Sequence, residues 1–63
     1  MTLVQVRADG SKPFTAGLIF AGDRCAWAAP ILRKFCLGRS KDTVRSIVAA
    51  NGWKAVIVAE WQA

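Results

Sequence analysis

The chain contains no histidine and no tyrosine, and only four of its 63 residues are acidic. These acids, Asp9, Asp23, Asp42 and Glu60, are mostly scattered at predicted turns and helix starts. General acid–base and nucleophilic catalysis both need titratable side chains that converge on one point, and this chain does not supply them. A phosphate-binding glycine motif is also missing. We therefore expect that the protein is not an enzyme and uses no cofactor.

Cysteine is scarce as well, since Cys25 and Cys36 are the only two. A structural zinc site takes four ligands, which two cysteines without a histidine cannot provide, so we expect no metal site. In a reducing cytoplasm both side chains are predicted to be free thiols that are buried as small apolar residues.

Long apolar runs are absent, because none approaches the roughly 20 residues that a membrane-spanning helix needs. The first seven residues show neither the basic nor the long apolar segment of a signal peptide. We expect no membrane contact and a cytoplasmic location. The length predicts a single domain, residues 1–63, and the 54% hydrophobic content is generous enough to form a core.

The first part of the chain has the pattern of two strands. Residues 2–7 alternate in a run rich in β-branched residues, with Val4 and Val6 on the same side. The turn-forming residues of "ADGSKP" follow, and Pro13 places the start of the second strand near Phe14.

A two-residue turn, "GD" at 22–23, joins the strand "FTAGLIFA" to a third, "RCAWA". Opposed residues in an antiparallel pair share a face, so pairing outward from this turn predicts which side chains face the core. The predicted core face of this hairpin consists of Leu18, Phe20, Cys25 and Trp27, with Ile19, Ala21, Arg24 and Ala26 on the other side.

Two short helices are predicted near residues 30–37 and 41–51. Pro30 is favoured in the first turn of a helix, Gly38 is a common helix-ending residue, and Ser40 is a good N-cap for the second helix. The apolar stripes expected to face the sheet are Leu32, Phe35 and Cys36, then Val44, Ile47 and Val48.

The last element is "WKAVIVAEW", whose five consecutive apolar residues run from Ala55 to Ala59. Such a run predicts a strand that is buried on both faces or lies in the centre of the sheet. The element order is then β-β-β-α-α-β. We expect an α+β domain in which a small antiparallel sheet carries both helices on one face.

The charge balance is basic, with nine Lys and Arg against four Asp and Glu and a net charge of +5. This sign favours polyanionic partners such as DNA or RNA. The candidate nucleic-acid-binding residues on the helix pair are Arg33, Lys34, Arg39, Lys41 and Arg45. The alternative interpretation is that these cations form only the solvated faces of two helices packed on a sheet.

The helix pair at residues 31–50 also resembles a helix-turn-helix motif, in which two short helices flank a glycine turn. The positions that match are Leu37, Gly38, Val44 and Ile47. Lys34 and Arg39 depart from the motif, because it has buried residues at these two positions. We therefore expect any nucleic-acid binding to be weak and to use phosphate contacts.

The sheet face without helices is a second candidate surface. It is predicted to carry Leu3, Ile19 and either Val56 with Val58 or Ile57. A ring as large as Trp61 gains little near the end of the chain unless it folds over the sheet edge or contacts a second chain. The candidate interface residues are Leu3, Ile19 and Trp61. We expect a non-catalytic interaction module that forms a homodimer or binds another protein, with weak nucleic-acid binding as the alternative.

Several short segments resemble a family of small phage- and prophage-encoded proteins of unknown function. The matching segments are "FTAG" at 14–17, "AAPIL" at 28–32, Gly38, Val44 and "GW" at 52–53. The resemblance implies expression from a mobile element in a bacterial cytoplasm. It implies no activity and no catalytic residues.

Overall fold

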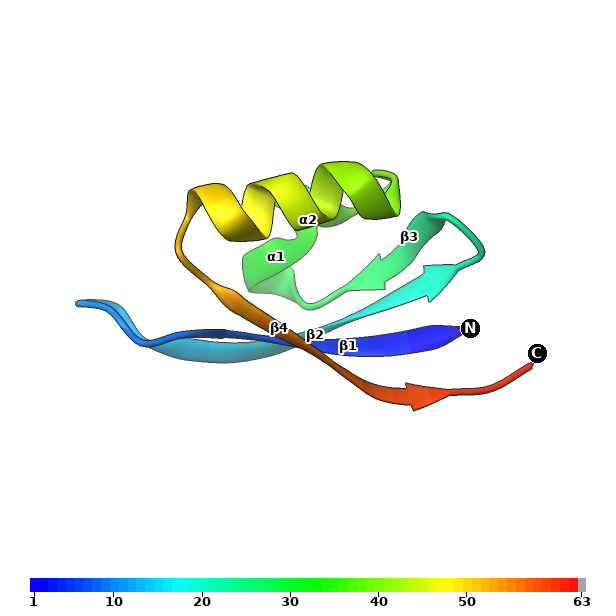
Figure 1. The fold of residues 1–63 in the computed structure, drawn as a ribbon, viewed down its shortest axis with the longest axis horizontal. Coiled ribbons are helices and arrows are strands. Elements are labelled where there is room, and N and C mark those ends of the chain that lie inside the picture. Colours follow the sequence, from blue (N-terminus) through cyan, green and yellow to red (C-terminus); the bar gives the residue numbers. More distant parts are fainter. Residues whose placement is uncertain (63) are drawn as a thin grey trace.

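The structure is a computed structural model that describes residues 1–62. Its elements are β1 (Thr2–Ala8), β2 (Phe14–Ala21), β3 (Arg24–Ala28), α1 (Pro30–Cys36), α2 (Lys41–Ala50) and β4 (Lys54–Glu60). The four strands form one antiparallel sheet in the order β3-β2-β1-β4, and both helices lie on the same side of it (Figure 1). The predicted α+β fold, element order and helix placement are confirmed. None of the described helices has the length and apolar character needed to cross a membrane.

The β1–β2 hairpin forms the middle of the sheet and follows the predicted alternation. Val4 is paired with Leu18 and Val6 with Ala16, and all four side chains are buried on the helix side. The core consists of apolar side chains from this face and from both helices, and Leu18 and Leu32 are fully buried within it.

The helix ends follow from local sequence chemistry. Pro30 occupies the first turn of α1, and Gly38 takes a φ of 78° as the chain turns toward α2. The Ser40 side chain accepts a hydrogen bond from the backbone N–H of Thr43 at 3.3 Å and so caps α2. Each helix ends one residue earlier than the predicted range, because Leu37 and Asn51 are the caps.

The predicted register of the β2–β3 hairpin is wrong beyond its first two pairs. A bulge leaves Ala26 unpaired, so Ile19 is opposite Trp27 and Leu18 is opposite Ala28. One extra residue reverses the facing of every side chain beyond it. Trp27 is therefore not in the core: it is 47% exposed on the helix-free face, and the small side chain of Ala28 takes the buried position.

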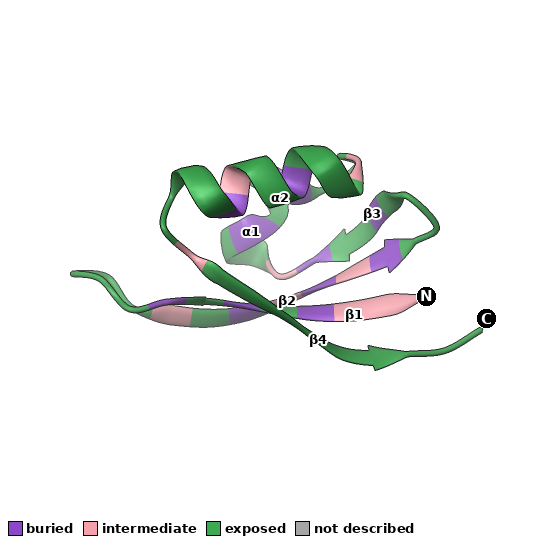
Figure 2. Ribbon diagram, in the orientation of Figure 1, coloured by how far each residue is buried: buried purple, intermediate pink, exposed green. Residues whose placement is uncertain are grey.

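The predicted burial of the last strand is also wrong. β4 is an edge strand, and each of its seven residues is exposed (Figure 2). The two helices have only seven and ten residues; α1 packs over β3 and β2, and α2 has only slight contact with β4. An apolar run can therefore lie at an edge here because the helix layer is too small to cover the whole sheet.

Candidate functional site

The outer edge of β4, residues 54–60, is the most exposed apolar feature of the protein. Val56, Ile57 and Val58 are 62%, 61% and 55% exposed. Within residues 1–62 the strand pairs only with β1, so the row of N–H and C=O groups on its outer side has no strand beside it. Long apolar edges of this kind readily pair with another chain, and natural proteins usually protect them.

The opposite edge of the sheet is protected in this way. The backbone N–H of Cys25 donates to the carbonyl of Arg39 at 2.9 Å, and the N–H of Gly38 donates to the carbonyl of Cys25 at 2.8 Å. A third bond joins the N–H of Lys41 to the carbonyl of Asp23 at 2.9 Å. The segment between the helices therefore covers the start of β3, and β4 is the bare edge.

The bare edge is held in a fixed position by β1. The backbones of Met1 and Trp61 exchange two hydrogen bonds, 2.6 and 2.9 Å long, just beyond the end of the strand. Ile57 is paired with Val4 and therefore faces the helices, whereas Val56 is paired with Gln5 and faces away from them. A partner at this edge would meet apolar side chains on both sides of the sheet.

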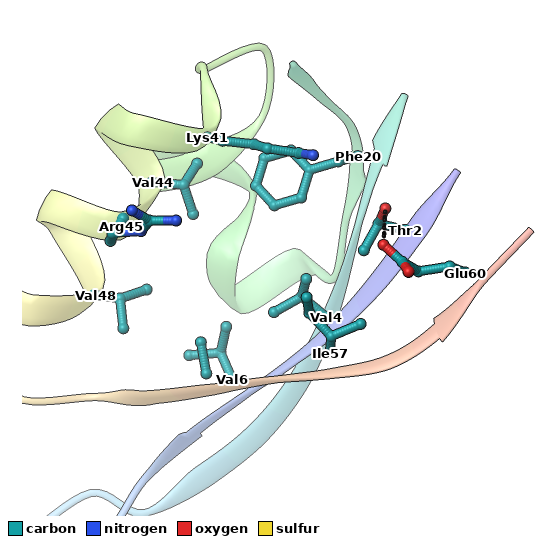
Figure 3. A pocket seen from close by; sticks show the side chains of 11 residues that line it. Thr2, Val4, Val6, Phe20, Lys41, Val44, Arg45, Val48, Ile57 and Glu60 are labelled. Carbon is teal, nitrogen blue, oxygen red and sulfur yellow. Dashed lines mark hydrogen bonds between the residues drawn. The ribbon is translucent and has the colours of Figure 1, made fainter. Parts of the chain in front are cut away.

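A groove of about 330 Å³ lies between α2 and β4 (Figure 3). Val4, Val6 and Ile57 line it from the sheet, and Val44 and Val48 line it from α2. It exists because α2 has only slight contact with β4, so the helix-facing side of this strand stays open to solvent. The groove extends the apolar surface of the edge toward the helices.

The five candidate nucleic-acid-binding cations are all exposed, but they do not all lie on one element. Lys41 and Arg45 come together on α2, where they line the groove beside β4 (Figure 3). Arg33 and Lys34 lie on α1, which packs mainly against β3 and α2. The fifth cation, Arg39, lies between the helices.

The three candidate interface residues are also divided. Leu3 and Ile19 are adjacent on the helix-free face, but both are half-buried. The Trp27 ring and a methyl group of Leu3 both lie over Gly17. A Cβ atom at position 17 would be 3.9 Å from the ring of Trp27 and 3.7 Å from the methyl of Leu3. Trp61 follows β4 and is 41% exposed. The open face is thus partly covered by its own side chains, and the exposed apolar surface is greatest along β4.

Sequence reasoning did not identify β4 as an edge. The available signal was the pair of charges, Lys54 and Glu60, that bound the apolar run at its two ends. Charged residues at the ends of an apolar strand are typical of edges that must be kept from indiscriminate pairing.

Both cysteine thiols lie in the core, with Cys25 2% exposed and Cys36 fully buried. Burial disfavours the thiolate and raises the pKa of Cys25 above the ordinary thiol value of 9.0; backbone hydrogen bonds at Trp27 and Ile19 oppose this in part. Burial likewise raises the pKa of Cys36, and the neighbouring Cys25 adds to the effect. The predicted burial of both residues is confirmed.

The raised thiol pKa values predict that stability falls at alkaline pH. Unfolded thiols ionise near pH 9.0, whereas the folded thiols stay protonated, so the folded state binds more protons as the pH rises past that value. The free energy of unfolding, measured by urea titration between about pH 7 and 10.5, should decline above about pH 9. The double variant C25A/C36A should show a shallower decline. An identical pH dependence in both proteins would contradict the prediction.

Comparison with protein families, with curated proteins and with solved structures finds no match for this chain. The resemblance to small phage proteins stays a prediction.

Proposed function

We propose that this protein is a non-catalytic interaction module that binds an extended strand of a partner protein along β4. The observation that carries the proposal is the bare edge itself, seven residues long and apolar at its five central positions. The contrast with the covered β3 edge supports it, because the same chain protects one edge and leaves the other free.

Strand addition gives affinity and specificity by different means. The unpaired N–H and C=O groups of β4 provide hydrogen bonds for any extended backbone, and side-chain contacts on alternate faces select the partner. Ile57, beside the groove, and Val56, on the opposite face, are the side chains that would make this selection. Trp61 lies just beyond the strand, where a bound chain would cover its exposed ring.

A second candidate function is weak nucleic-acid binding through the basic helices. Its specific support is that the five exposed cations form no ion pair among residues 1–62, where Arg7 with Asp9 is the only pair. The edge strand is the better supported surface, because Lys41 and Arg45 line the groove beside it rather than a separate basic face. We place either activity in a reducing bacterial cytoplasm, which suits the two buried thiols.

Photo-crosslinking in cells tests the proposal. A photoreactive amino acid at Val58, on the edge, should form covalent adducts with protein, and the same amino acid at Ile31, on α1, is the control. The two positions are similarly exposed, at 55% and 50%. A third probe, at Arg45, reports on nucleic acid.

Protein adducts from position 58 that position 31 does not give are the expected result. No protein adduct from position 58 would contradict the strand-binding function. If nucleic acid is instead recovered from position 45, the second candidate function is favoured.

A further inference from the structure

We infer that the strand bound by β4 is β4 of a second copy of the same chain, and this inference rests on the proposed function. The strand reads "KAVIVAE", so its five apolar residues are the same in both directions. Its two ends carry opposite charges, Lys54 and Glu60. A strand with this sequence is complementary to itself when the two copies run antiparallel.

The symmetric register places a two-fold axis at Ile57. The bulge at Val58 shifts the facing of the residues beyond it, so Val56 shares the helix-free face with Ala59 of the second copy, and Ala55 shares the helix side with Glu60. The Lys54 end of one strand then lies beside the Glu60 end of the other, whereas a parallel arrangement would put like charges side by side. Opposite charges at facing positions stabilise a pair of strands and like charges destabilise it, so the charges select the antiparallel arrangement.

The bulge in the β1–β4 pairing determines how these charges act. Lys54 pairs with Arg7 on the helix-free side of the sheet. Glu60 lies on the helix side, paired with Thr2, whose hydroxyl is 3.5 Å from its carboxylate. Lys54 of one copy and Glu60 of the other therefore lie on opposite faces of the paired sheet, where their attraction is weak and no ion pair forms between them.

The paired sheets would form one continuous sheet in the order β3-β2-β1-β4-β4-β1-β2-β3, with all the helices on one face. The grooves of the two copies would meet at the two-fold axis, with both Ile57 side chains between them. The outer edges of the pair are the two β3 strands, and the backbone of Gly38 to Lys41 covers the start of each. Association therefore closes at two copies and does not continue into a fibre.

The contact is modest in size, because it consists of one seven-residue strand and the side chains beside it. Interfaces at the low end of the size range are reversible, and we expect a Kd on the order of micromolar.

A charge swap tests the pairing, with sedimentation equilibrium as the readout. The proteins compared are the wild type, K54E, E60K and the double variant K54E/E60K. Each single variant places like charges at neighbouring strand ends, at both ends of the pair, and should raise the Kd by about 3- to 10-fold. The double variant restores opposite charges at both ends and should dimerise within about twofold of the wild type. Lys54 and Glu60 are exposed, so all four proteins should give the same circular dichroism spectrum.

A wild type that stays monomeric at about 1 mM would overturn the self-pairing. A double variant that is no better than the single variants would overturn the antiparallel register. A monomer that is crosslinked to another protein from position 58 keeps the proposed function and removes only the second copy as the partner. A monomer without any protein adduct removes both.

Discussion

Replacing Leu32 with alanine should lower the free energy of unfolding by about 3 kcal/mol. Leu32 lies on α1, is fully buried, and belongs to the core between the helices and the sheet. Truncation removes apolar contacts and leaves a cavity, which together cost about 2–5 kcal/mol at buried leucines. At about 0.05–0.15 kcal/mol per residue, a chain of 63 residues has roughly 3–9 kcal/mol of total stability. The substitution should therefore remove a third or more of it.

The matched control is Ile31→Ala, one residue earlier on the same helix. Ile31 is 50% exposed, so its truncation should cost less than about 1 kcal/mol. Urea unfolding followed by tryptophan fluorescence measures both variants. Equal losses at the two positions would mean that α1 does not pack on the sheet through Leu32.

Replacing Ile57 with lysine should abolish self-association, with a rise in Kd of at least about 100-fold. In the symmetric register the two copies of residue 57 face each other at the two-fold axis. Lysine there removes an apolar contact and brings two positive charges together, and both changes oppose pairing. Charged residues, lysine above all, are also what natural edge strands use to prevent association.

The free energy of unfolding of the Ile57→Lys variant distinguishes a loss of self-association from misfolding. Ile57 is 61% exposed, so the monomer should retain its fold and lose little free energy of unfolding. Ile31→Lys makes the same chemical change on α1 and should leave the dimer intact. Dimerisation of the Ile57→Lys variant with wild-type affinity would place the interface elsewhere on the molecule.

The fold could be predicted because its signals are local. Alternation in β1 placed Val4 and Val6 on the same side of the strand, which is the core side in the structure, and Gly38 and Ser40 marked the corner between the helices. Each of these residues acts through the conformation of its own segment. Their contributions do not depend on how the strands are ordered.

The interaction edge depends on strand order and could not be predicted in the same way. The run from Ala55 to Ala59 fits a central strand by composition, and only the pairing of β1 with both β2 and β4 places it at the edge. The burial of Trp27 could not be predicted either, because the unpaired Ala26 moves the Trp27 ring to the helix-free face. Strand order and bulges are set by the packing of the whole sheet, so a single segment does not reveal them.

An isotope-filtered nuclear Overhauser experiment detects contacts between the β4 strands of two copies. Equal amounts of carbon-13-labelled and unlabelled protein are mixed, so that only contacts between different copies are detected. Self-pairing along β4 predicts contacts between the two Ile57 side chains and between the methyls of Val56 and Ala59. Contacts between copies that involve Leu3, Ile19 and Trp27 on the open face, with none from β4, would contradict it.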